Sequence, residues 1–188
     1  LTVRSQTACL LAIRYGLVQG RELENAADLL KEKILQNNST LSTGFVGTGI
    51  LNQTLSQVGL DALAYSLLLQ TRDPSWLYSV RQGATTVWER WNSYTLEKGF
   101  GNVSMNSFNH YAYGAVAEWM YESMAGIKAD PAHPGFTHFI LAPKPDFRSG
   151  EEIPAGQERI RHVKAYFAAR TGRIESEWGY ENGRFTYR

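Results

Sequence analysis

The chain has 188 residues, of which 43% are hydrophobic and 12% aromatic, and its 19 basic and 18 acidic residues leave a net charge of +1. This length suits one domain or parts of two, and charges of both signs are spread along the chain, so we expect no nucleic acid partner and no anionic membrane surface as partner. A single cysteine excludes a disulfide within the chain, and no apolar run approaches the roughly 18 residues of a membrane span.

The first third of the chain has helical periodicity. The stretch 2–18 spaces apolar residues at three and four positions, and the stripe consists of Ala8, Leu11, Ala12 and Tyr15. Cys9 lies among apolar residues, so we expect a buried structural thiol. A second helix is predicted over 21–36, with acidic residues early and lysines late, as the helix dipole favours. After the glycine-rich stretch GFVGTG, 44–49, which we expect to be a loop, two more helices are predicted over 50–59 and 60–70.

The middle of the chain alternates predicted helices with an extended stretch. Asp73 and Pro74 are typical of the start of a helix, and Gly83 is typical of its end. The stretch ATTVWERW, 84–91, is rich in β-branched and aromatic residues and is expected to be extended. A further helix is predicted from Asn106 or Ser107 to Gly126, with His110 in its first turn.

The last part of the chain has the pattern of β-structure. Short apolar and aromatic runs at 136–143, 161–169, 172–181 and 183–188 are separated by segments rich in Pro, Gly and Ser, and Asn182-Gly183 is typical of a two-residue hairpin turn. Helices followed by antiparallel strands predict two domains, with a boundary between residues 129 and 134.

Glu89 is the first candidate catalytic residue, because it lies between Trp88 and Trp91 and beside Arg90. A catalytic carboxylate needs a fixed and partly desolvated position with room for a substrate, and bulky flat neighbours favour such a setting. The same residues also fit a simpler arrangement, in which the tryptophans pack inward and Glu89 pairs with Arg90 at the surface. The residues alone leave both interpretations open.

Histidines offer a second candidate but no predicted metal site. His110 fits a structural role as well as a functional one, and with Tyr113, three positions later, it could form a proton-abstracting pair on one helix face. The four histidines, at 110, 133, 138 and 162, are scattered and show no metal-ligand spacing with acidic or cysteine partners. GFVGTG lacks the lysine of a phosphate-binding loop, so no cofactor is expected.

Two motifs occurring together, GATTVWERW at 83–91 and MNSFNHYAYGAV at 105–116, resemble those of bacterial α-L-rhamnosidases of glycoside hydrolase family 78. The similarity covers 44–127 and continues, less specifically, through PGFTHFILAPKP at 134–145. It implies the C-terminal part of an (α/α)6 barrel over 1–130, followed by the beginning of an antiparallel β-sandwich over 131–188.

The resemblance also implies an activity and residue roles. The family removes terminal α-L-rhamnosyl groups with inversion, so the expected partner is a rhamnose-containing glycoside, oligosaccharide or polysaccharide. Glu89 would be the general base, and His110 would contact the bound rhamnose. Trp88 and Trp91 are both candidates to wall the sugar, and the sequence leaves open which of them faces the pocket and which the core. Arg90 and Asn106 would support the site. Asn92 departs from the family, where an aspartate often follows the motif.

Inverting hydrolysis requires a second carboxyl group, about 6.5–9.5 Å from the first. In the family this general acid lies upstream, in an acidic motif of the type DERxGWTGD, and nothing over 1–44 matches it. We therefore expect the chain to be a fragment that acts with the rest of a larger protein, in the periplasm or outside the cell rather than in the cytoplasm.

Two other functions stay open at this stage. One is a different carbohydrate enzyme on a helical toroid, either another inverting glycosidase or a polysaccharide lyase that uses His110 and Tyr113. The other is a carbohydrate-binding remnant without catalytic activity.

Overall fold

The computed structural model describes residues 4–188, and the chain divides into two compact units, Leu1–Val116 and Ala117–Arg188. The predicted start of the first helix, at Thr2, lies outside the described residues. Among the helices of residues 4–188, none has both the length and the apolar character that crossing a membrane demands.

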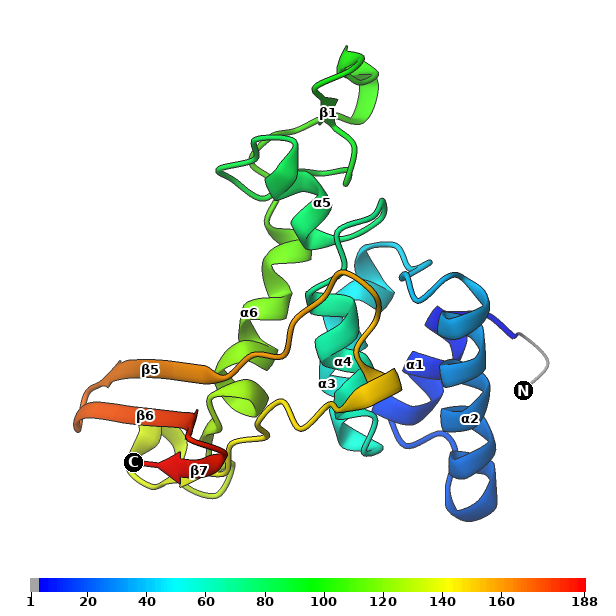
Figure 1. Ribbon diagram of the computed structural model, residues 1–188. Coiled ribbons are helices and arrows are strands. Elements are labelled where there is room, and N and C mark those ends of the chain that lie inside the picture. The colour runs from blue at the N-terminus through cyan, green and yellow to red at the C-terminus, as the bar shows by residue number, and fades with distance from the viewer. Residues whose placement is uncertain (1–3) are drawn as a thin grey trace. The chain divides into compact units, whose positions relative to one another are not determined.

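The first unit is helical. Its helices are α1 (Gln6–Arg14), α2 (Gly20–Gln36), α3 (Phe45–Gln57), α4 (Asp61–Leu68) and α5 (Trp76–Arg81). Helix α1 packs against α2 and α3, and α3 packs against α4 (Figure 1). Their core is formed by buried side chains that include Leu10, Ile13, Leu30, Ile34, Leu51 and Leu55. The helical prediction for this part of the chain is confirmed.

The inner face of α1 differs from the predicted stripe. Ala12 is buried, but Tyr15 is 67% exposed, and the core instead takes up Cys9, Leu10 and Ile13. The sequence of α1 is apolar on several sides, so the packing of α2 and α3 decides which side is buried. The predicted burial of Cys9 is confirmed, and this burial raises the pKa of its thiol.

The predicted loop at GFVGTG is wrong, because α3 begins at Phe45 within it. Gly47 explains the glycine content in another way. A Cβ atom at this position would lie 2.7 Å from Thr7 Oγ1 and 2.9 Å from Thr43 Cβ. The glycine therefore permits close packing around the first turn of α3 and does not form a turn of its own.

The segments that follow α4 differ from the prediction as well. Helix α5 starts at Trp76, and its N-cap is Ser75, whose hydroxyl accepts a hydrogen bond from the Tyr78 amide. Stretch 84–91 is irregular and not a strand. After it come a two-stranded ribbon of β1 (Tyr94–Thr95) and β2 (Gly99–Phe100), and the short 3-10 turn η1 (Val103–Met105).

The helix predicted from Asn106 or Ser107 starts at Tyr111 instead. It consists of the 3-10 turn η2 (Tyr111–Ala115), one turn of α6 (Val116–Trp119) and the π-helical turn η3 (Met120–Met124). His110 therefore lies directly before the helical segment, in an extended conformation, and not in its first turn.

The second unit contains two antiparallel sheets. Strands β3 (Ile127–Ala129) and β4 (Phe139–Leu141) form one sheet, and the 3-10 turn η4 (Pro134–Phe136) lies between them in sequence. The turn η5 (Gly150–Glu152) follows. The other sheet consists, in this order, of β5 (His162–Ala169), β6 (Gly172–Glu181) and β7 (Arg184–Tyr187). The predicted hairpin is confirmed: Asn182 and Gly183 have φ values of 51° and 78°, and Glu181 pairs with Arg184.

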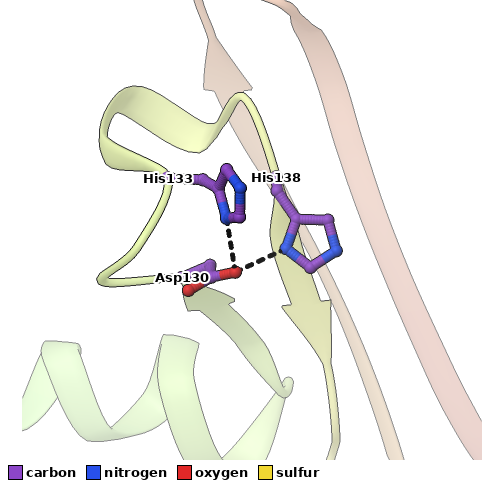
Figure 2. A group of neighbouring side chains, drawn as sticks. All are labelled: Asp130, His133 and His138. Carbon is purple, nitrogen blue, oxygen red and sulfur yellow. Dashed lines mark hydrogen bonds and ion pairs between the residues drawn. The ribbon is translucent and has the colours of Figure 1, made fainter.

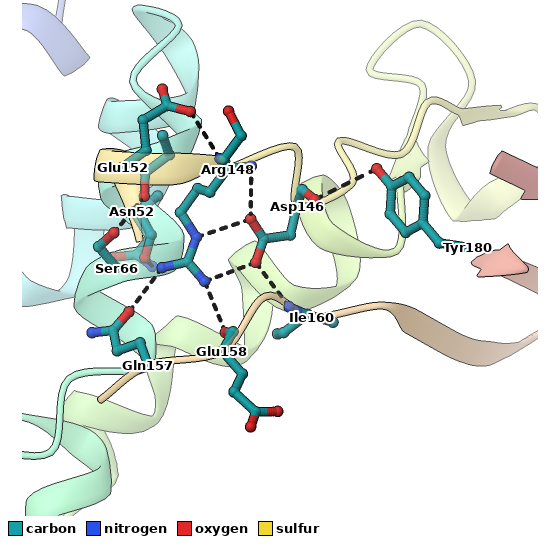
Figure 3. Close-up of polar contacts among 12 residues, drawn as sticks. Asn52, Ser66, Asp146, Arg148, Glu152, Gln157, Glu158, Ile160 and Tyr180 are labelled. Atoms are coloured by element: carbon teal, nitrogen blue, oxygen red, sulfur yellow. Dashed lines mark hydrogen bonds and ion pairs between the residues drawn. The ribbon is translucent and has the colours of Figure 1, made fainter. Parts of the chain in front are cut away.

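A buried ion pair organises the irregular segment between β4 and β5 (Figure 3). Arg148 donates from Nε to Asp146 Oδ1 at 2.9 Å and from Nη2 to Asp146 Oδ2 at 2.8 Å, and both side chains have no exposed surface. Arg148 also donates to Gln157 Oε1, and Asp146 accepts from the Ile160 amide. Two buried charges are thus compensated by each other and by further hydrogen bonds, as buried ion pairs require.

Replacement of Arg148 by Met should lower the free energy of unfolding by about 3–5 kcal/mol, because Asp146 would be left buried without its cation. The matched control is Arg173→Met, since Arg173 pairs with Glu175 at 2.6 Å while both side chains are more than half exposed. That change should cost less than about 1 kcal/mol. Denaturant unfolding of both variants measures the difference, and equal losses would contradict this account of Arg148.

Candidate active site

Two irregular segments of the first unit are joined by main-chain hydrogen bonds. The amide of His110 donates to the Val87 carbonyl oxygen at 2.9 Å, and the amide of Glu89 donates to the Ser107 carbonyl oxygen at 2.9 Å. These bonds place the segment of Glu89 beside that of His110, although the ribbon β1–β2 and the turn η1 lie between them in sequence. The structure therefore brings the two motifs together.

The carboxylate of Glu89 is held by the main chain. Its Oε2 accepts a hydrogen bond from the Ser107 amide at 2.8 Å, and the side chain is half-buried. Within residues 4–188, Oε1 has no hydrogen-bond partner, and no ion pair links Glu89 to Arg90. The alternative of a surface ion pair is thus wrong for this structure, and one carboxylate oxygen is fixed while the other is free.

Trp88 and Trp91 are both buried, with exposures of 7% and 9%. Trp88 packs edge-to-face on Phe108, with ring centroids 5.3 Å apart. Trp91 stacks on Tyr113 at 3.9 Å and meets Trp76 edge-to-face at 5.5 Å. Aromatic partners account for both indoles, so they fix the backbone on either side of Glu89; contact with a sugar stays a prediction.

His110 has an unusual environment. Its ring stacks on Phe45, with centroids 4.5 Å apart and an interplanar angle of 18°. Its Nδ1 atom is buried and has no hydrogen-bond partner among the described residues. Since buried polar atoms are nearly always paired, this unpaired nitrogen is an unusual feature of the segment.

Asn106 and Arg90, the predicted supporting residues, lie on the same two segments. Asn106 Nδ2 donates to the Ser93 carbonyl oxygen at 3.0 Å, while its Oδ1 is buried without a partner in the described part of the chain. Arg90 is half-buried, and its amide donates to Ser93 Oγ at 3.1 Å. Both residues thus meet at Ser93, in the turn that follows Trp91.

Tyr113 is a structural neighbour of the site. It is buried between Phe45 and Trp91, and this burial raises the pKa of its hydroxyl, with the negative charge of Glu89 adding to the shift. A tyrosine that acts as a base needs a lowered pKa, so the structure does not favour Tyr113 as one half of a proton-abstracting pair.

The prediction that no histidine has an acidic partner at metal-ligand spacing is wrong for His133, which lies three residues after Asp130, while His138 and His162 have acidic partners at longer separations in sequence. His133 and His138 each place Nδ1 near Asp130 Oδ2, at 2.9 and 2.7 Å (Figure 2), and His162 Nε2 lies 3.0 Å from Glu177 Oε1. The pKa of Asp130 is lowered by hydrogen bonds from His133, from the Ala132 amide and from His138. In the sequence, the spacing of three residues between Asp130 and His133 was the signal that could have predicted this contact.

Comparison with known proteins matches both parts of the chain to domains of the same family. Residues 1–124 match the bacterial alpha-L-rhamnosidase 6 hairpin glycosidase domain, and residues 126–188 match the bacterial alpha-L-rhamnosidase C-terminal domain. The first match includes both motifs that meet at Glu89 and His110.

Individual relatives agree with the family models. An α-L-rhamnosidase of Formosa agariphila is 48% identical over 141 residues, which cover 75% of this chain and 15% of that protein. The structure of an α-L-rhamnosidase of Streptomyces avermitilis complexed with L-rhamnose is similar at 38% identity with a TM-score of 0.84, over 97% of this chain and 16% of that one. The native α-L-rhamnosidase of Aspergillus terreus is similar at 34% identity with a TM-score of 0.83, over 100% of this chain and 20% of that one.

Tyr113→Leu should lower the free energy of unfolding by about 2 kcal/mol, because it removes a buried ring that stacks on Trp91. Tyr111→Leu is the matched control, since Tyr111 belongs to the same 3-10 turn but is 88% exposed. This control should change stability by less than about 0.5 kcal/mol. Denaturant unfolding tests both variants; the same loss in each would show that the aromatic stack does not support the site.

Proposed function

The chain belongs to the bacterial α-L-rhamnosidases, and on this premise we propose that it forms part of an inverting hydrolase that removes terminal α-L-rhamnosyl groups. In this proposal the helical unit is the C-terminal part of an (α/α)6 barrel, and the strands of the second unit begin a β-sandwich. The chain spans 15% of the Formosa relative and 16% of the Streptomyces structure, so the activity is proposed for a larger protein that contains it.

The arrangement of Glu89 carries the proposal. One carboxylate oxygen is held by the Ser107 amide, which fixes the orientation of the group, and no cation of residues 4–188 pairs with the other. A general base needs this combination of a fixed position and a free oxygen. His110 lies on the adjoining segment, which the bond from its amide to the Val87 carbonyl oxygen joins to the segment of Glu89.

In the proposed reaction, Glu89 takes a proton from a water molecule that attacks the anomeric carbon on the face opposite the leaving group. A second carboxylic acid, outside this chain, protonates the glycosidic oxygen as the bond breaks. The two carboxyl groups of inverting enzymes stand about 6.5–9.5 Å apart, which leaves room for the water. The product is then rhamnose of inverted configuration.

The other residues of the two motifs support this chemistry. We assign His110 to a hydroxyl group of the rhamnose, with Phe45 holding the imidazole ring by stacking. Trp88, Trp91, Arg90 and Asn106 position the segment around Glu89. The similar Streptomyces structure is a complex with L-rhamnose, which supports the choice of sugar.

The alternatives receive less support. A lyase using His110 and Tyr113 would need a reactive tyrosine, whereas burial raises the pKa of Tyr113. A binding remnant would not need a carboxylate with a fixed orientation and one free oxygen. A different inverting glycosidase would share the mechanism and differ in the sugar, which substrate comparison decides.

Glu89→Gln in the intact protein should lower kcat for an aryl α-L-rhamnoside by at least about a thousandfold, with little change in KM, because the amide cannot accept the proton from water. The amide oxygen can still accept the hydrogen bond from Ser107, so the fold should persist. Steady-state kinetics measures the effect, and circular dichroism checks the structure.

Glu24→Gln, at an exposed position of α2, is the matched control and should keep full activity. With Glu89→Ala, azide should enter the space that the side chain leaves and restore turnover, with a glycosyl azide of inverted configuration as product. Activity of Glu89→Gln within about tenfold of the unmodified protein would refute the assignment of the base.

His110→Ala should raise KM for the same substrate by about tenfold or more, which corresponds to the loss of one hydrogen bond of about 1.5 kcal/mol. His162→Ala is the control, because His162 is an exposed residue of β5 and pairs with Glu177. Kinetics over a range of substrate concentrations separates KM from kcat. An unchanged KM and kcat for His110→Ala would remove this residue from the site.

A further inference from the structure

Three metal-ligand side chains converge at the end of the sheet formed by β3 and β4 (Figure 2). They are Asp130, His133 and His138, and one ligand atom of each lies within 4.8 Å of the other two. Oxygen from a carboxylate and nitrogen from imidazole are both ligands that zinc accepts. This cluster has no part in the proposed hydrolysis.

We propose that Asp130, His133 and His138 form a site for a zinc ion. The ligand atoms would be Asp130 Oδ2 and Nδ1 of each histidine, since both nitrogens already face Oδ2, at 2.9 and 2.7 Å. Zinc bonds of about 2.0–2.2 Å in a tetrahedron separate neighbouring ligand atoms by about 3.3 Å. The oxygen and nitrogens therefore need to move apart by only about half an ångström.

The backbone holds the three residues in place. Asp130 follows β3 and His138 precedes β4, and the pairing of Ala129 with Phe139 sets these two residues opposite each other. The Asp130 carbonyl oxygen accepts from the His133 amide at 2.9 Å, which closes a tight turn. A metal ion would thus bind to a short loop whose two ends are already joined.

The carboxylate of Asp130 is oriented by a contact outside the cluster. Its Oδ1 accepts a hydrogen bond from the Ala132 amide at 2.9 Å, so Oδ2 is directed toward the two imidazole rings. Contacts of this kind fix the direction of a ligand and contribute to the affinity of metal sites. At Glu177 and His162, by comparison, a carboxylate meets a single histidine.

Exposure and charge suit a site that a metal ion can enter. The side chains of His133 and His138 are 58% and 61% exposed, whereas Asp130 is 18% exposed. Three protein ligands leave the fourth tetrahedral position for water on the open side. Two neutral imidazoles and one carboxylate give the cluster one negative charge, which the ion would more than compensate.

Protons compete with the metal for this cluster. In the metal-free state, both Nδ1 atoms lie at hydrogen-bond distance from Asp130 Oδ2, and metal binding requires each Nδ1 to be unprotonated. Zinc binding at Nδ1 therefore requires the neutral tautomer of each imidazole that carries its proton on Nε2. Bound zinc would connect β3 to β4 and stabilise the second unit by mass action.

The test is a zinc titration of the intact protein after treatment with a chelator, by isothermal titration calorimetry near neutral pH. His133→Ala/His138→Ala should bind one zinc ion fewer than the unmodified protein, and each single variant should bind that ion at least about tenfold more weakly. His162→Ala, which alters the other exposed pair of histidine and carboxylate, should bind zinc like the unmodified protein.

A second measurement does not depend on how well the double variant folds. Cobalt(II) in place of zinc should give the unmodified protein and His162→Ala a visible absorption band typical of four-coordinate cobalt, and Asp130→Asn should lose it. Equal zinc stoichiometry and affinity in the unmodified protein and the double variant would overturn the proposal. An Asp130→Asn spectrum identical to that of the unmodified protein would do so as well.

Discussion

The reciprocal bonding of Glu89 and Ser107 is the constraint on which the site depends. The Glu89 amide donates to the Ser107 carbonyl oxygen, and the Glu89 carboxylate accepts from the Ser107 amide. Neither segment is a helix or a strand, so this exchange, together with the bond from His110 to Val87, supplies the order that regular structure would otherwise provide. A side chain that takes part in its own positioning loses little freedom when a substrate arrives.

Aromatic packing explains why this irregular region keeps its shape. Trp91 stacks on Tyr113, and the indole of Trp76 donates to the Tyr113 carbonyl oxygen at 2.8 Å. Tyr113 also contacts Phe45, which in turn supports His110. The high aromatic content of the chain therefore has a structural use around the site. In these residues the rings form the scaffold that holds the segments of Glu89 and His110.

Sequence patterns predicted those elements whose local signals agree with their packing. Helix α2 has a strong stripe with dipole-matched charges, and Asn182-Gly183 has the backbone preference of its turn. GFVGTG was mistaken for a loop because glycine marks both turns and close packing, and Thr7 near Gly47 is invisible to a local pattern. The start of the helical segment at Tyr111 was missed for a similar reason, since the amides of Ser107 and His110 bond to distant residues instead.

The site was predicted in part by motif and completed by tertiary contacts. The joint occurrence of the two motifs predicted that Glu89 and His110 belong to one site, and main-chain bonds do place their segments side by side, but the contact with Ser107 depends on a main-chain bond that no residue type encodes. The same limit applies to Asp130 and His138, eight positions apart in sequence, which the pairing of β3 with β4 brings together. Spacing rules designed for helices detect Asp130 and His133 but not Asp130 and His138, which lie at the two ends of a hairpin-like loop.

The forked contact between Arg148 and Asp146 has a consequence for how the second unit opens. Between β4 and β5 the chain has little regular structure, and the Ile160 amide is bonded to the same carboxylate that binds the guanidinium. Freeing that amide would expose a buried charge, so the segment should not fray by small steps. Hydrogen exchange at Ile160 would then follow a cooperative opening of the unit, although the residue lies just before a strand and on an irregular segment.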